Sequence, residues 1–144
     1  MPDSLHEIPV RADPQSVFDA WTTSEGLSSW WTKDSRAASE PGEVNVFVFD
    51  GGSVEFHFRI DEQVPGKRVR WTGVQADNMP NEWVGTRIEV DLEPSDDGTR
   101  LRFGHVGWKS AEGMYCVCNT TWGELMYRLR DHCEGTGRGP LFEG

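Results

Sequence analysis

The chain has 144 residues, of which 36% are hydrophobic and 26% charged, and its formal net charge is −10. This composition is typical of a globular protein and excludes a disordered chain. The length predicts one domain, residues 1–144, that is large enough to form a core without disulfides. Nucleic acid and anionic membrane surfaces repel an acidic protein, so neither is an expected partner. No apolar run approaches the roughly 18 residues that cross a bilayer.

The N-terminus and the cysteines predict a cytoplasmic location. The first seven residues lack the basic and apolar regions of a secretion signal. The odd number of cysteines, three, favours free thiols in a reducing compartment. A metal site is not expected, because Cys116 and Cys118 would point about 200° apart on a helix and Cys133 lies far along the chain. The phosphate-binding and dinucleotide-binding motifs are also missing, so no cofactor is expected.

The first 40 residues predict one short strand and two helices. Apolar and polar residues alternate over 5–10, which favours a strand, and Pro9 favours a position at the sheet edge. Asp13 precedes a proline, the pair that begins many helices, and predicts a helix over 14–22. A second short helix is expected over 24–31, where apolar residues recur at helical spacing.

From residue 43 the spacing of apolar residues changes from about 3.6 to 2. Turn sequences such as Asp50-Gly51-Gly52 and Asp96-Asp97-Gly98 separate the alternating segments. The pattern predicts five hairpin-linked antiparallel strands with one polar face. We expect them over residues 43–49, 54–61, 68–72, 87–93 and 100–105, with a polar loop over 75–84.

The segment 111–134 returns to helical spacing and predicts a long C-terminal helix. One stripe of this helix carries Met114, Cys118, Thr121, Leu125, Leu129 and His132. A curved sheet with one apolar face needs a cover, and this stripe provides it. The sequence therefore predicts an α+β helix-grip fold, a curved antiparallel sheet wrapped around the C-terminal helix. The core is expected over about 5–135, followed by a loose tail over 136–144.

Several motifs in this order resemble the SRPBCC (START-like, Bet v allergen-like) superfamily. The opening resemblance lies in Ile8-Pro9-Val10-Arg11-Ala12-Asp13-Pro14, in Val17-Phe18-Asp19-Ala20-Trp21-Thr22, and in Glu25-Gly26-Leu27 with Trp30-Trp31. The branch named for the activator of the heat-shock-protein-90 ATPase is similar in Pro41-Gly42, Arg68-Val69-Arg70-Trp71, His105-Val106-Gly107-Trp108 and Trp122-Gly123-Glu124-Leu125. The resemblance covers roughly residues 5–140. It implies the helix-grip fold, but its members include ligand carriers, cyclases and co-chaperone domains.

The aromatic residues are the main candidates for a binding site. Seven Trp, seven Phe and two Tyr either build a core or line a pocket. Cys118 and Thr121 are too small to fill the hollow of a curved sheet, so we expect a mostly apolar cavity between sheet and helix. Its expected lining is Trp30, Trp31, Phe56, Phe58, Trp71, Phe103, His105, Trp108, Met114, Cys118 and Trp122.

His105 is the one candidate for proton transfer. It shares strand parity with Leu101 and Phe103, which places it on the inner face. The resemblance puts the matching position at the mouth of the cavity, where a neutral imidazole could bond a ligand or act as a general base. The alternative is a structural histidine bonded to a backbone group.

Three functions remain open at this point. The first is a cytoplasmic protein that binds a small apolar or amphipathic ligand in the cavity. The second is a cyclase-like or hydrolase-like enzyme that uses the same cavity, with His105 moving a proton; it lacks an inward carboxylate to orient this histidine. The third, implied by the branch name, is a module that contacts a chaperone. The resemblance is also compatible with a homodimer, because relatives often pair through their sheets.

Overall fold

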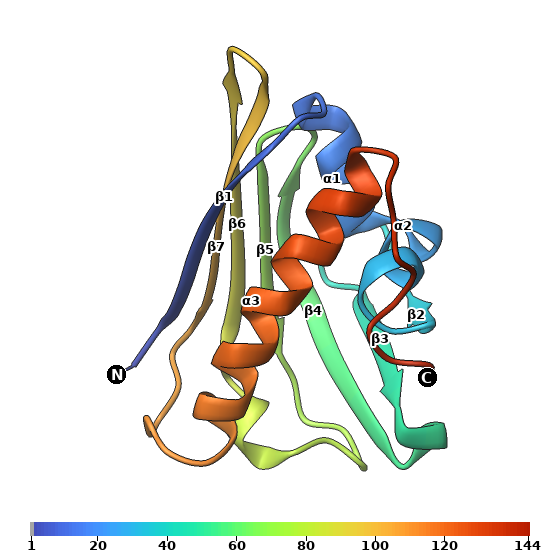
Figure 1. Ribbon diagram of the computed structural model, residues 1–144. Helices are drawn as coiled ribbons and strands as arrows, with labels where there is room; N and C mark the ends of the chain where they lie inside the picture. The colour runs from blue at the N-terminus through green and yellow to red at the C-terminus, as the bar shows by residue number, and fades with distance from the viewer. Residues whose placement is uncertain (1) are drawn as a thin grey trace.

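The computed structural model of the protein describes residues 2–144 and contains one seven-stranded antiparallel sheet. The strands lie side by side in the order β1-β7-β6-β5-β4-β3-β2, and the sheet curves around a long helix (Figure 1). This arrangement confirms the α+β helix-grip fold. The strands are β1 (Ser4–Val10), β2 (Asp34–Arg36), β3 (Val44–Phe49), β4 (Val54–Val64), β5 (Arg68–Gly73), β6 (Arg87–Ser95) and β7 (Gly98–Val106).

The two short helices form where the sequence predicts them, as α1 (Pro14–Thr22) and α2 (Ser24–Trp30). Asp13 caps α1, since its side chain accepts a hydrogen bond from the Ser16 backbone N–H at 3.2 Å. Thr23 ends α1 and caps α2. Gly26 is required at this corner, because a Cβ there would lie 2.7 Å from Cα of Ala20. The two helices are therefore locked close together at one end of the sheet.

The long helix α3 (Met114–Cys133) crosses the inner face of the sheet (Figure 1). It begins three residues later than predicted, after a glycine whose positive φ of 62° breaks the helical backbone. Most of the predicted stripe faces inward, and Met126 joins it although the spacing did not assign it there. The buried residues of α3 are Cys118, Trp122, Leu125, Met126 and Leu129.

The inner face of the sheet is apolar and its outer face is charged. In β4 the residues Phe56, Phe58 and Ile60 are buried, as the alternation predicts. On the outer face, ion pairs join neighbouring strands, for example Arg70 Nη2 to Asp91 Oδ1 at 2.9 Å. Such exposed pairs each contribute little to stability. The alternation therefore gives the correct face for most of the sheet.

Two elements were missing from the sequence prediction. Strand β2 has three residues, two of them charged, and is too short to show an alternating pattern. It occupies the edge opposite β1, whose edge position agrees with the presence of Pro9. Within the predicted polar loop, a single 3₁₀ turn, η2 (Asn81–Trp83), buries its last residue, Trp83. A second 3₁₀ turn, η1 (Asp50–Gly52), makes the turn between β3 and β4.

The C-terminal segment 136–144 is not loose, which corrects the expectation from its glycines. Phe142 forms a parallel bridge with Thr32, through hydrogen bonds from Phe142 N–H to the Trp31 carbonyl (3.0 Å) and from Lys33 N–H to the Phe142 carbonyl (2.9 Å). Arg128 of α3 donates to the carbonyls of Gly139 and Pro140. The backbone of the segment runs beside α2 (Figure 1), and the ring of Phe142 packs edge-on against Phe49.

None of the helices within residues 2–144 is long and apolar enough to span a membrane.

Candidate functional site

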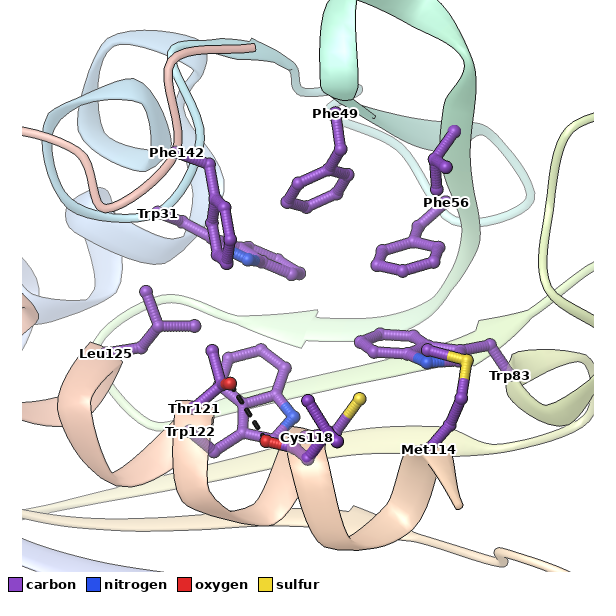
Figure 2. A pocket seen from close by; sticks show the side chains of 12 residues that line it. Trp31, Phe49, Phe56, Trp83, Met114, Cys118, Thr121, Trp122, Leu125 and Phe142 are labelled. Carbon is purple, nitrogen blue, oxygen red and sulfur yellow. Dashed lines mark hydrogen bonds between the residues drawn. The ribbon is translucent and has the colours of Figure 1, made fainter.

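A cavity of about 220 Å³ lies between the first turns of α3, the η2 turn and the β3–β4 hairpin. Figure 2 shows its side chains facing one another across the opening. Of the described residues that line it, none carries a charge, and Val117 at its rim is 66% exposed. The lining consists of Trp31, Phe49, Val54, Phe56, Trp83, Met114, Val117, Cys118, Thr121, Trp122, Leu125 and Phe142.

Six aromatic rings make up much of the cavity wall and support one another. The rings of Phe56 and Trp83 stack with centroids 3.9 Å apart and planes 12° apart. Phe49 packs against Phe56 at 4.8 Å and edge-on against Phe142 at 5.1 Å. Such contacts fix the orientation of rings beyond what burial alone would do. The aromatic wall is therefore held in place by contacts among its own rings.

The side of the cavity formed by α3 is lined by small side chains. The Thr121 hydroxyl donates to the Val117 carbonyl at 2.9 Å, so its proton is used within the helix (Figure 2). Burial, together with the negative charge of Glu82, raises the pKa of the Cys118 thiol to about 11, although the Trp83 indole partly opposes this shift. A thiol with this pKa stays protonated at neutral pH and is a poor nucleophile.

His105 lies behind this wall, fully buried, and both of its ring nitrogens are engaged. The Trp122 indole N–H donates to His105 Nδ1 at 3.0 Å. Because an indole nitrogen can only donate, the proton of the neutral imidazole must be on Nε2. Nε2 then donates to the Thr86 hydroxyl at 2.8 Å, and that hydroxyl donates to the Trp83 carbonyl at 2.6 Å.

This chain of hydrogen bonds holds two walls of the cavity in place. It connects Trp122 of α3, through His105 and Thr86, to the turn that carries Trp83. Burial lowers the pKa of His105 to about 3, which keeps the imidazole neutral. With both nitrogens occupied inside the core, His105 is a positioning residue and has no nitrogen left for a substrate. This geometry fits the alternative that the sequence left open, a structural histidine. Its ring is bonded to the side chains of Thr86 and Trp122, whereas a backbone partner was expected.

Gly73 brings the Trp83 turn close to the sheet. A Cβ at this position would collide with the backbone carbonyl of Trp83. The N–H of Gly73 donates to the Thr86 carbonyl at 2.8 Å, and the N–H of Gly85 donates to the Gly73 carbonyl at 2.9 Å. The absence of a side chain on Gly73 thus allows Trp83 to reach the cavity.

The structure divides the residues expected at the site into two groups. Five of them line the cavity: Trp31, Phe56, Met114, Cys118 and Trp122. The other six are packed in the core away from it: Trp30, Phe58, Trp71, Phe103, His105 and Trp108. Three indoles in the second group use their N–H within the protein. Trp30 donates to the Ala20 carbonyl, Trp71 to Gln63 Oε1 and Trp108 to the His105 carbonyl. Strand parity identifies the inner face correctly, but the cavity occupies only one end of it.

Seven lining residues were not expected at the site. The burial of Trp83 could be predicted from the sequence, because a lone tryptophan in a polar loop favours a buried place for its large ring. Phe142 had a weaker signal, because it follows Leu141 in an otherwise Gly-rich tail. Thr121 and Leu125 belong to the predicted stripe of α3, and Val117 lies beside it. Phe49 and Val54 flank a turn, where the sequence did not show which residues point inward.

Metal ligands are not gathered anywhere in the part of the chain from residue 2 onward: no three His, Cys, Asp or Glu side chains lie close enough to hold an ion. Cys116 is exposed, Cys118 buried and Cys133 half-buried, and all three are free thiols.

Comparison with known proteins identifies the family. The family model "Activator of Hsp90 ATPase homolog 1-like protein" matches residues 11–134, whereas no curated protein matches the chain. A similar fold is seen in the solution structure of the Aha1 dimer from Colwellia psychrerythraea, with a TM-score of 0.84. The two sequences are 34% identical, and the match covers 94% of this chain and 98% of that one.

Two further solved structures share the fold at lower identity. Protein MLL2253 from Mesorhizobium loti has a TM-score of 0.82 at 18% identity, over 94% of this chain and 98% of that one. The AHSA1-like protein from Aeromonas hydrophila has a TM-score of 0.72 at 13% identity, over 95% and 96% of the two chains. The extent of the family match and the 34% identity show that this chain belongs to the family of Activator of Hsp90 ATPase homolog 1-like proteins.

Proposed function

We propose that this protein binds a small, mostly apolar molecule in the cavity between α3 and the sheet, and that it does so in the cytoplasm. The observation that carries this proposal is the cavity of about 220 Å³ with six aromatic rings and no charged side chain among its lining residues. Concave apolar sites with few polar groups are the usual form of a small-molecule site. The neutral, fully bonded His105 and the protonated Cys118 favour binding over catalysis.

The size of the cavity restricts the ligand. An apolar cavity of about 150 Å³ holds one benzene ring, so this one suits a compact molecule of one or two rings or a short branched chain. Long acyl chains would have to leave through the rim at Val117, which is exposed. The ligand class is therefore small and compact.

Native mass spectrometry of protein purified from cells tests the proposal and would give the mass of a bound molecule. A matched variant, Cys118→Leu, puts a larger apolar side chain into the cavity while it keeps the surface of α3 unchanged. We expect a copurified mass in the wild type that is lost in Cys118→Leu, together with weaker binding of added isopropylbenzene in an NMR titration. If isopropylbenzene fails to bind the wild type, or binds both proteins equally, the proposed site is wrong.

A second candidate function is contact with a protein partner. It is favoured by the family description, which names an activator of the Hsp90 ATPase, and by the similarity to a protein described as an Aha1 dimer. The charged outer face of the sheet, with pairs such as Arg102–Glu7 and Arg100–Glu93, offers an exposed surface for such contacts. Light scattering tests self-association, and the ATPase rate of a purified Hsp90-type chaperone with and without this protein tests the chaperone contact. An unchanged rate at saturating protein would exclude activation.

A further inference from the structure

The wall of the cavity contains one polar atom that has no oxygen or nitrogen partner. Trp83 is 3% exposed, and its indole nitrogen Nε1 is buried without a hydrogen-bond acceptor among residues 2–144. A buried donor that is left unpaired is costly, and such groups in native proteins call for an explanation. The Trp122 indole on the same wall differs, because its N–H donates to His105.

The unpaired N–H faces the cavity. In Figure 2 the nitrogen edge of the Trp83 ring is turned toward the side chains of Met114 and Cys118, which both line the cavity. The indole is near enough to the Cys118 thiol to oppose the rise in its pKa. A sulfur atom is nevertheless a weak acceptor and does not replace an oxygen. One face of the ring is stacked on Phe56 with the planes 12° apart, and this contact fixes the plane in which the N–H lies.

The electrostatics of the cavity exclude an ionised acceptor. None of the lining side chains in the described part of the chain is cationic, so a bound carboxylate would be desolvated without a counter-charge. Glu82, next to Trp83 in the chain, adds negative potential, which also raises the pKa of Cys118. The partner of the Trp83 N–H must therefore be a neutral acceptor, such as a carbonyl oxygen.

We propose that the ligand is an uncharged aromatic or alicyclic carbonyl compound, a ketone or ester of one or two rings, whose carbonyl oxygen accepts a hydrogen bond from Trp83 Nε1. This inference rests on the proposed function and adds the chemical class of the ligand. The aromatic walls bind the hydrocarbon body, and the indole N–H selects the oxygen and fixes the orientation. Small-molecule sites commonly combine apolar walls with a few placed polar groups that set specificity, and here the Trp83 N–H is that group.

The test compares two probes of similar shape, acetophenone and isopropylbenzene, in wild type and in Trp83→Phe. The substitution keeps an aromatic ring and removes the N–H. Trp21→Phe is the matched control, because the Trp21 indole N–H is also buried and unpartnered but Trp21 does not line the cavity. Affinities of both probes are measured by NMR titration of each protein.

In Trp83→Phe we expect the affinity for acetophenone, relative to that for isopropylbenzene, to fall about 2- to 13-fold, the range for one neutral hydrogen bond. In Trp21→Phe the ratio should equal that of the wild type. The infrared band of the acetophenone carbonyl provides a measurement on the wild type alone: it should lie at lower wavenumber when bound than in an alkane solvent.

Three results would overturn the proposal. An unchanged ratio in Trp83→Phe shows that the indole does not select the oxygen, although an apolar ligand still binds. A bound carbonyl band at the alkane position shows the same for the wild type, even if the variant does not fold. If neither probe binds the wild type, the proposed function fails first and this inference fails with it.

Discussion

The two ends of the space between α3 and the sheet are both rich in tryptophan, but only one is filled. At the closed end, under α1 and α2, Trp21, Trp30 and Trp71 pack with ring centroids as close as 4.8 Å. At the open end, the rings of Phe49, Phe56 and Trp83 surround the cavity. The difference lies in what α3 presents to the sheet: Met126 and Leu129 at the closed end, Cys118 and Thr121 at the open end.

This comparison shows that aromatic content does not by itself indicate a binding site. Rings make a core where large aliphatic side chains of a neighbouring element fill the space between them. Rings line a cavity where the neighbouring side chains are small and where contacts between the rings fix their orientations. The same substitution should therefore have different effects at the two ends.

Truncation of α3 at its two ends gives the largest expected contrast. Leu129 is fully buried at the closed end, and Leu129→Ala should lower the free energy of unfolding by about 3–4 kcal/mol, because it removes apolar contacts and leaves a void. Met114 is half-buried beside the existing cavity, and Met114→Ala should cost less than about 1 kcal/mol. Urea unfolding measures both. Equal losses would show that the open end is as tightly packed as the closed one.

The buried His105 should make stability depend on pH. Its pKa is about 3 in the folded protein and about 6.5 when unfolded. Below pH 6.5 the unfolded chain takes up a proton that the folded protein does not, so the stability is complete above pH 6.5 and is lost as the pH falls toward 3. At pH 4.5 the loss should be about 3 kcal/mol, at 1.36 kcal/mol per pH unit.

Urea unfolding at pH 7.0 and pH 4.5 measures this loss. His105→Gln is the control, because it removes the titrating group and should remove most of the pH dependence in this interval, although it is less stable at pH 7. His6, whose pKa is also lowered by burial, contributes in the same direction and is controlled by His6→Gln. A wild-type stability that does not change between the two pH values would contradict the buried neutral state.

Enlarging a side chain should have opposite effects at the two ends. Cys118→Leu extends into the cavity and should leave the melting temperature unchanged or raise it, since it buries added apolar surface. Ala20 is buried in α1 at the closed end, and Ala20→Leu should cost about 1–3 kcal/mol because no space exists for the added atoms. Thermal unfolding of both variants measures the contrast. A destabilised Cys118→Leu would show that the cavity cannot accept a side chain.

The smallest effect is expected for Phe142, which closes one side of the cavity from the C-terminal segment. Phe142→Ala should reduce stability by about 1 kcal/mol or less, since the ring is only partly buried. Dissociation of isopropylbenzene should become a few-fold faster, because the ring no longer covers the cavity. NMR exchange rates measure this change. Unchanged rates would place the exit path elsewhere, at the rim formed by Val117.

The sequence by itself determined the fold, because its signals are local. Asp13 with Pro14 begins α1, the alternation of Phe56, Phe58 and Ile60 sets the inner face of β4, and the stripe of α3 matches that face. It also indicated a hollow, since Cys118 and Thr121 are too small to fill a curved sheet.

Only the tertiary structure decided where along the inner face the hollow lies and which rings surround it. Parity states which face a side chain occupies, but the height of α3 over each strand depends on contacts between distant segments. Trp83 reaches the cavity because Gly73 lets its turn approach the sheet. Phe142 reaches it because the tail pairs with Thr32. Strand parity makes His105 a candidate base, yet its partners, Thr86 and Trp122, lie 19 and 17 residues away and use both of its nitrogens.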